Sequence, residues 1–322
     1  MMTFDRDKMK AQAASLAAQG LYIGTSSWKY PGWLGQLYTP ERYVWRGRYA
    51  NSRFERNCLA EYAEVFKTVC VDAAYYKFPT RDYLGGMVDQ VPGDFQFAFK
   101  VTDEITIKQF PNLPRFGHRA GQVNGNFLNA NLFASAFLRP CEEFRANVGV
   151  LMFEFTRFYG ADFARGREFV AALAEFLGKL PRGWPYAVEI RNRSFLQPEY
   201  FAMLAGHGVA HVFNSWTDMP PVGEQIELPG AFTHPALCSA RFLLKPGRKY
   251  EEAVKQFSPY EKLQEPNPAG RAAAVKLLRR TTGVSQPARV FIYVNNRFEG
   301  SALASIAAML DETGPPPSAD EG

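Results

Sequence analysis

Short apolar runs rich in β-branched and aromatic residues alternate along the chain with segments whose apolar residues recur at helical spacing. The short runs have the length and composition of buried strands. They fall at residues 21–27, 68–76, 95–101, 148–155, 186–192, 210–216, 237–244 and 288–296. Helical patterns lie between them, most clearly at residues 51–66, 126–144, 161–180, 271–280 and 301–310. The helix at 161–180 should be capped by Asp162 and end before Pro181.

Eight strands that alternate with helices favour a single (β/α)8 barrel of the TIM type, and the alternative is an open, doubly wound sheet. The 322-residue chain is therefore divided into an N-terminal extension (1–20), one barrel domain (21–312) and a disordered tail (313–322). Three long connections, at 28–50, 102–125 and 217–236, follow strands. They belong to the carboxyl face, where barrel proteins carry their sites.

The alternation of side chains along each strand predicts which residues point into the barrel. In the strand at 237–244, Cys238, Ala240 and Phe242 form the apolar outer set, so Ser239 and Arg241 point inward. The same rule sends inward Cys70, Asp72, Tyr76, Lys100, Glu154, Glu189, Arg191, Tyr293 and Asn295, with either His211 or Asn214. Unpaired buried charges are costly, so the charged groups of this ring must meet each other, water or a ligand.

Acid/base chemistry is the main prediction for this ring. The catalytic candidates are Glu189, Glu154, Asp72 and Lys100. Glu189 comes first as general acid or base, because crowding by Glu154 would raise its pKa while Arg191 would oppose that shift. Lys100 would hold substrate charge or form a Schiff base. A glycosidase would need two carboxylates ~5–9 Å apart. The alternative is a salt-bridge network that only closes the barrel, in which case Glu189→Gln mainly lowers stability.

Substrate binding is assigned to guanidinium, amide, hydroxyl and aromatic groups near the same end of the barrel. The candidates are Arg191, Arg241, Asn295, Asn296, Tyr76, Trp28, Trp33 and Ser26. Arginine forks suit phosphate or carboxylate. The aromatic residues would stack on a sugar or base, or pack as a lid. A second anion site is suggested at 244–250 and 295–304, where Gly247 and Gly300 would let a phosphate approach; ordinary turn glycines are the alternative.

Amino-acid composition limits the classes of ligand and partner that we expect. The 37 basic and 32 acidic residues give a net charge of +5, which permits anionic ligands without indicating nucleic acid. The four cysteines form no CxxC pair and are expected to be reduced, buried thiols of a cytoplasmic protein. No apolar run approaches the ~18 residues that cross a membrane. No cofactor is predicted; Mg²⁺ among Asp72, Glu154 and Glu189 is the minor alternative, because the basic groups compete for those carboxylates.

Five segments carry a family resemblance: 24–40, 62–76, 95–106, 186–195 and 290–296. They resemble the family of domain of unknown function seventy-two, the YecE-like proteins, in order and over most of the chain. The resemblance implies a β/α barrel whose function is not settled. The residues that fit the family pattern are Trp28, Trp33, Tyr76, Lys100, Glu189, Arg191, Asn295 and Asn296. The family usually has Glu and Asn at the positions of Cys70 and Asp72, and His and Trp at those of Asn192 and Phe195.

These patterns together predict a protein that binds a small polar or anionic molecule carrying phosphate or sugar. An enzyme would be a hydrolase, lyase or isomerase that uses acid/base chemistry at the carboxyl ends of the strands. The alternative is a non-catalytic protein that binds a nucleotide or nucleic acid. The substrate and the oligomeric state stay open.

Overall fold

Eight parallel strands close into a barrel in the computed structural model, which describes residues 4–280 and 289–313. Going round the barrel the order is β1, β10, β9, β8, β7, β6, β5 and β4, and β4 pairs with β1. The predicted (β/α)8 barrel is therefore confirmed, and the open sheet is excluded. The strands are β1 (Leu21–Ser26), β4 (Thr68–Val71), β5 (Gln96–Lys100), β6 (Val148–Glu154), β7 (Tyr186–Glu189), β8 (Ala210–Asn214), β9 (Leu237–Phe242) and β10 (Arg289–Val294).

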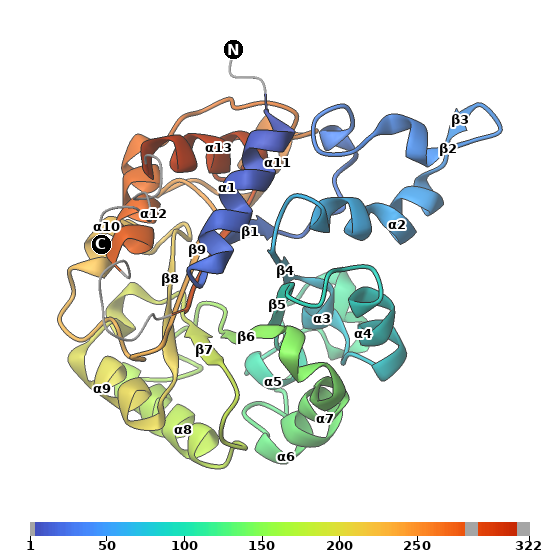
Figure 1. Cartoon of the computed structure of the whole chain (residues 1–322). Coiled ribbons are helices and arrows are strands. Elements are labelled where there is room, and N and C mark those ends of the chain that lie inside the picture. The colour runs from blue at the N-terminus through green and yellow to red at the C-terminus, as the bar shows by residue number, and fades with distance from the viewer. Residues whose placement is uncertain (1–3, 281–288, 314–322) are drawn as a thin grey trace.

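Helices surround this barrel (Figure 1). The α-helices are α1 (Arg6–Ala18), α2 (Asn51–Ala63), α3 (Ala73–Tyr76), α4 (Arg81–Val88), α5 (Asp103–Thr106), α6 (Ala130–Leu132), α7 (Arg139–Cys141), α8 (Gly166–Gly178), α9 (Pro198–His207), α10 (Val222–Ile226), α11 (Tyr250–Phe257), α12 (Pro268–Arg280) and α13 (Ala302–Thr313). Shorter 3₁₀ turns are η1 (Pro31–Trp33), η2 (Pro40–Tyr43), η3 (Pro114–Arg119), η5 (Glu142–Asn147) and η6 (Arg193–Phe195). A two-residue hairpin, β2 (Val44–Trp45) with β3 (Arg48–Tyr49), projects beyond α2 (Figure 1).

The barrel interior is filled by side chains that alternate with those facing the helices, as the sequence pattern predicts. Cys238, Ala240 and Phe242 belong to the large apolar cluster between strands and helices. A separate interior cluster consists of Cys70, Ala98, Val150, Met152, Ala187, Ala210, Val212, Leu237, Phe291 and Tyr293. This cluster, which we call the apolar plug, fills the barrel below its carboxyl end. The polar side chains above it are therefore accessible only from the carboxyl face.

Three predicted elements have different limits in the structure. The strand predicted at 68–76 ends at Val71, because the chain turns at Asp72 into the short helix α3. The helix predicted at 161–180 begins only at Gly166, and Asp162 instead accepts a hydrogen bond from Tyr159 N. The helix predicted at 126–144 contains a π turn, η4 (Phe133–Leu138). Pro140 lies just beyond it and has no N–H for the helical ladder, so the hydrogen bonds shift register there.

The two ends of the chain differ in what the structure shows. Residues 6–18 of the predicted extension form α1, whose Met9 and Ala13 are buried. The predicted tail at 313–322 lies outside the described residues except for Thr313, which ends α13. All four cysteines are buried, and none is in a disulfide bond. In the described part of the chain, no helix combines the length and apolar character needed to cross a membrane.

Candidate functional site

The register of the strands brings the predicted charged ring together. Glu154 and Glu189 are direct neighbours at the ends of β6 and β7. Arg241 on β9 lies beside Asn214 of β8 and Tyr293 of β10. Lys100 ends β5, and Asp72 and Arg191 follow β4 and β7 closely. Because these positions share the inward face at one end of the barrel, side chains distant in sequence meet above the apolar plug.

Glu154 is the centre of the ring. Its Oε2 accepts hydrogen bonds at 2.5 Å from Arg241 Nη1 and lies 2.9 Å from both Lys100 Nζ and Arg191 Nη2. Glu189 accepts at 2.7 Å from Arg241 Nη1 and at 3.2 Å from Arg191 Nε. Three cations and three carboxylates, counting Asp72, thus form one connected network. Its formal charge is zero only when Asp72 is counted, because the buried members are three cations and two carboxylates.

The network fixes the protonation of two members. Burial opposes ionisation of Glu154, but Arg191, Lys100 and Arg241 outweigh it and hold the pKa of this carboxyl well below its usual range. Burial likewise favours a neutral Lys100, but Glu154 and Asp72 raise the pKa of its amine above its usual value. Glu154 is therefore a carboxylate and Lys100 an ammonium at neutral pH.

Asp72 differs from the other two carboxylates because it reaches solvent. Its side chain is 30% exposed, against 3% for Glu154 and 0% for Glu189. Asp72 Oδ1 lies 3.5 Å from Lys100 Nζ and 3.8 Å from Arg241 Nη2, and it accepts no hydrogen bond from a described residue. Ser26 Oγ, Ser239 Oγ and Arg241 Nε are also buried without a hydrogen-bond partner among the described residues. Buried polar atoms normally have partners, so we expect these atoms to bond to water or to a polar ligand.

Arg191 connects the ring with a surface hollow. The hollow measures about 500 Å³ and is lined by Arg157, Arg191, Asn192, Arg193, Ser194, Gln197 and Asp218. Arg191 uses Nε and Nη2 in the ring, and its guanidinium carbon lies 3.7 Å from the centre of the Trp216 ring. Three arginines and one aspartate line the hollow, so its lining has more positive than negative side chains. Arg157 pairs with that aspartate, Asp218, at 2.7 Å.

Several predicted binding residues lie elsewhere. Tyr76 is exposed on α3 rather than inside the barrel, and its neighbour Tyr75 is the ring that covers Lys100, at 4.3 Å from Nζ. Trp28 and Trp33 are buried in the apolar cluster, which is the lid packing named above as the alternative to stacking on a ligand. Ser26 does lie in the buried interior. Of the two alternatives in β8, His211 packs outward against Phe213 and Tyr200, while Asn214 takes the inward position beside Arg241.

Asn295 and Asn296 are buried, and their side chains accept hydrogen bonds from the protein's own backbone. Asn295 Oδ1 accepts from Arg297 N, and Asn296 Oδ1 accepts from Ala302 N at the start of α13. Gly300 has φ 107°, and a Cβ there would lie 2.8 Å from Lys262 O. The amide that a phosphate would use at α13 is therefore already bonded, and Gly300 allows close packing of two backbone segments.

Sequence reasoning missed the residues that surround the ring. Tyr75 and Trp216 cover Lys100 and Arg191, and Arg157 and Arg193 line the hollow. Arg157 and Arg193 lie in connections, where alternation gives no information about direction. Tyr75 and Trp216 lie beyond the ends of β4 and β8, although the strands predicted from sequence extended to residues 76 and 216. The only signal available was the excess of arginine and aromatic residues in these connections.

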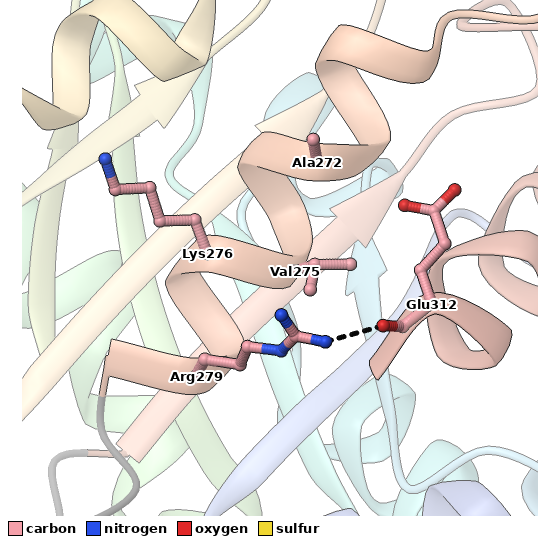
Figure 2. Close-up of a pocket in the computed structure, with 5 residues that line it drawn as sticks. All are labelled: Ala272, Val275, Lys276, Arg279 and Glu312. Atoms are coloured by element: carbon pink, nitrogen blue, oxygen red, sulfur yellow. Dashed lines mark hydrogen bonds between the residues drawn. The ribbon is translucent and has the colours of Figure 1, made fainter. Parts of the chain in front are cut away.

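A second hollow, of about 480 Å³, lies between α12 and α13 (Figure 2). Both basic side chains that line it have partners within the protein. Lys276 pairs with Glu227, and Arg279 donates a hydrogen bond to the backbone carbonyl oxygen of Glu312. This hollow is on the outer helical layer and brings no catalytic candidate together. Among the described residues, no group of three or more His, Cys, Asp or Glu side chains could hold a metal ion. The expectation of no cofactor stays a prediction.

A family model described as "Protein of unknown function DUF72" matches residues 22–320. The chain belongs to the DUF72 family. The family resemblance read from the sequence is thereby confirmed. No curated protein matches the chain.

Solved structures of DUF72 proteins share this fold. One from Enterococcus faecalis V583 has a TM-score of 0.62 and 19% sequence identity, and the match covers 92% of this chain and 96% of that chain. One from Thermotoga maritima MSB8 has a TM-score of 0.55 and 20% identity, with 91% and 98% covered. At this identity the likeness concerns the fold alone.

Proposed function

We propose that this DUF72 protein is an enzyme that acts on a small polar or anionic substrate by acid/base chemistry at the carboxyl ends of its strands. The observation that carries the proposal is Asp72, a solvent-reaching carboxylate whose buried Oδ1 has no hydrogen-bond partner in the described chain and which faces Lys100 and Arg241. Clustered ionisable groups in this position of a barrel are the usual form of an active site.

Asp72 is the group we assign to proton transfer. Glu189 and Glu154 are sealed from solvent and bonded to arginines, so a substrate above the ring meets Asp72 first. Glu154 and Glu189 then act as positioning residues that hold Arg191, Arg241 and Lys100 in place. This division changes the order of the carboxylates expected from sequence, where Glu189 came first.

The cations would bind and stabilise negative charge on the substrate. Lys100 is an ammonium, so its role is electrostatic and a Schiff base is not supported, since that reaction needs the neutral amine. Arg191 reaches both the ring and the basic hollow. A hollow of about 500 Å³ suits a small molecule, because such sites span ~300–1,000 Å³. We infer a substrate bearing phosphate or carboxylate, its charged group in the hollow and its reacting group at Asp72.

A glycosidase is not favoured. Glu154 and Glu189 bond the same nitrogen of Arg241, so that arginine occupies the space where a glycosidic bond would lie between two carboxylates. Isomerisation, elimination or hydrolysis at a site next to an anionic group is compatible with one half-buried carboxylate beside an ammonium. Four cysteines without a disulfide bond support our proposal that this activity is cytoplasmic.

A trapping experiment tests the proposal. Asp72→Asn keeps the size and polarity of the side chain but cannot accept a proton, so it should retain substrate that the wild type converts. Native mass spectrometry of both proteins, purified identically from cells, should show an extra mass on Asp72→Asn only. Asp94→Asn, an exposed carboxylate paired with Lys67, is the matched control. Bare protein in all three samples would count against the proposal, and so would an equal ligand mass on the control.

The runner-up is a non-catalytic protein that binds a nucleotide or nucleic acid. It is favoured by three exposed aromatic side chains, Trp45, Tyr76 and Tyr159, each of which has an arginine over its ring. It predicts that Asp72→Asn leaves both binding and any bound mass unchanged.

A further inference from the structure

Three exposed aromatic side chains on the carboxyl-face connections each have an arginine over the ring. Trp45, Tyr76 and Tyr159 are 62%, 59% and 65% exposed. The guanidinium carbons of Arg46, Arg115 and Arg157 lie 5.9, 5.5 and 5.5 Å from the respective ring centres. Tyr and Trp side chains are enriched where proteins contact their partners, because each combines an apolar ring with a polar group. We call these six residues the rim pairs.

The rim pairs occupy one continuous arc of the barrel. Trp45 and Arg46 belong to the connection after β1, Tyr76 to that after β4, Arg115 to that after β5, and Tyr159 and Arg157 to that after β6. Strands β1, β4, β5 and β6 are successive neighbours in the closed barrel. Figure 1 shows the projecting hairpin and α3 on the same side of the molecule.

Three of the four connections in the arc carry more basic than acidic residues. Lys and Arg outnumber Asp and Glu by four to one in residues 27–50, by three to two in 102–125 and by two to one in 155–165. The connection after β4, residues 72–95, has two basic and four acidic residues, so the positive excess lies in the connections after β1, β5 and β6. A positive surface set with open rings is the arrangement that holds single-stranded nucleic acid, where phosphates meet cations and unpaired bases stack on aromatic faces.

We propose that this arc of the carboxyl face binds single-stranded nucleic acid through the rim pairs. The arginines contact phosphates, and Trp45, Tyr76 and Tyr159 stack on bases. The proposal does not depend on acid/base chemistry at Asp72, since none of the rim residues pairs with a ring carboxylate.

Fluorescence anisotropy with a labelled 20-nucleotide single strand, titrated with the full-length protein at several salt concentrations, tests the aromatic contacts. Trp45→Ala and Tyr159→Ala should each weaken binding about tenfold. Tyr250→Ala, a tyrosine 39% exposed at the start of α11 after β9 and outside the arc, should leave affinity unchanged. The same sequence as a duplex should bind more weakly, because its bases are already stacked. Equal affinity of wild type and both rim variants, or tighter binding of the duplex, would overturn the proposal.

The salt dependence tests the arginines. The triple variant Arg46→Asn, Arg115→Gln, Arg157→Gln should reduce the slope of log K against log salt by about two, given ~0.7 per phosphate contact on a single strand. Arg46 has φ 49° next to Gly47 at φ 76°, and Asn favours this turn, so the hairpin survives. Lys10, Arg139 and Arg182, exposed in segments that lead into strands, make the matched triple Gln control.

Two further measurements separate this proposal from its neighbours. Asp72→Asn should bind the strand like wild type, whatever its effect on turnover. Poly-glutamate should compete far less well than unlabelled oligonucleotide, because it offers charge without bases. Loss of binding in folded Asp72→Asn, or equal competition by poly-glutamate, would overturn the proposal.

Discussion

Asp72 Oδ1 lies 3.5 Å from Lys100 Nζ, close enough for an ion pair but without a hydrogen bond. Every other carboxylate oxygen that Lys100 or the two arginines contact in the ring is held at 2.5 to 3.2 Å. The ring therefore has a tight, buried part centred on Glu154 and a looser member that faces solvent. This asymmetry separates a residue that can react from residues that hold the site together.

Among the carboxylates of the ring, Glu154 should contribute most to the free energy of unfolding. Glu154→Gln leaves Lys100, Arg191 and Arg241 with too little negative charge in a buried site, which costs about 3–5 kcal/mol of unfolding free energy. Urea unfolding monitored by circular dichroism measures this. Glu143→Gln breaks an exposed pair with Arg81 and should leave the free energy of unfolding nearly unchanged. Equal effects of the two variants would contradict a buried network.

The same carboxyl sets an acid limit on stability. The pKa of Glu154 in the folded protein lies well below its value in the unfolded chain. Its contribution to the free energy of unfolding is therefore complete above about pH 4.3 and is lost as the pH falls further. We expect wild type to lose unfolding free energy below this pH more steeply than Glu154→Gln. Parallel curves of unfolding free energy against pH for the two proteins, between about pH 4.5 and about pH 2.5, would contradict the assignment.

His211 should govern stability nearer neutral pH. Burial lowers its folded pKa from 6.5 to about 3, so as pH falls below 6.5 only the unfolded chain gains the proton, and folding weakens by up to about 1.4 kcal/mol per pH unit. His211→Phe fits the surrounding aromatic rings and should flatten the dependence of unfolding free energy between about pH 6.5 and pH 5. His207→Phe, an exposed control, should keep the wild-type slope. An unchanged slope in His211→Phe would show that another group titrates.

Arg193 should serve anion binding without serving the fold. It lies exposed in the hollow beside Arg191 and pairs with no described carboxylate. Arg193→Gln should weaken binding of inorganic phosphate, measured by isothermal titration calorimetry, about tenfold, the effect of one charge-assisted hydrogen bond. Arg182→Gln, exposed at the opposite end of the barrel, is the control. Identical phosphate affinities of the two variants would remove the hollow from the site.

Gly300 should matter for packing. Gly300→Ala places a Cβ 2.8 Å from Lys262 O at φ 107° and should cost about 1–3 kcal/mol in urea unfolding. Gly86→Ala, in α4 with open space around it, should instead gain about 0.5–1 kcal/mol. A neutral Gly300→Ala that weakens phosphate binding would restore the anion site predicted there from sequence.

Alternation along the strands was enough to predict the barrel and its ring. Glu154, Glu189 and Arg241 could be placed inward because their strand neighbours are apolar and must face the helices. Tyr76 was misplaced because alternation was carried past Val71, where the chain becomes helical and Tyr75 turns toward Lys100. The solvent exposure of Asp72 and the contact of Trp216 with Arg191 depend on how connections fold over the barrel end, and local sequence does not specify that.

The proposed activity depends most on Asp72 acting as a catalytic residue. The direct measurement is to incubate wild type and Asp72→Asn separately with a protein-free cell extract and to follow all small molecules by liquid chromatography and mass spectrometry. We predict at least one phosphate- or carboxylate-bearing compound that wild type consumes with formation of a product, while Asp72→Asn leaves it intact. An extract that wild type leaves unaltered, or a compound that both proteins convert at the same rate, would contradict the account.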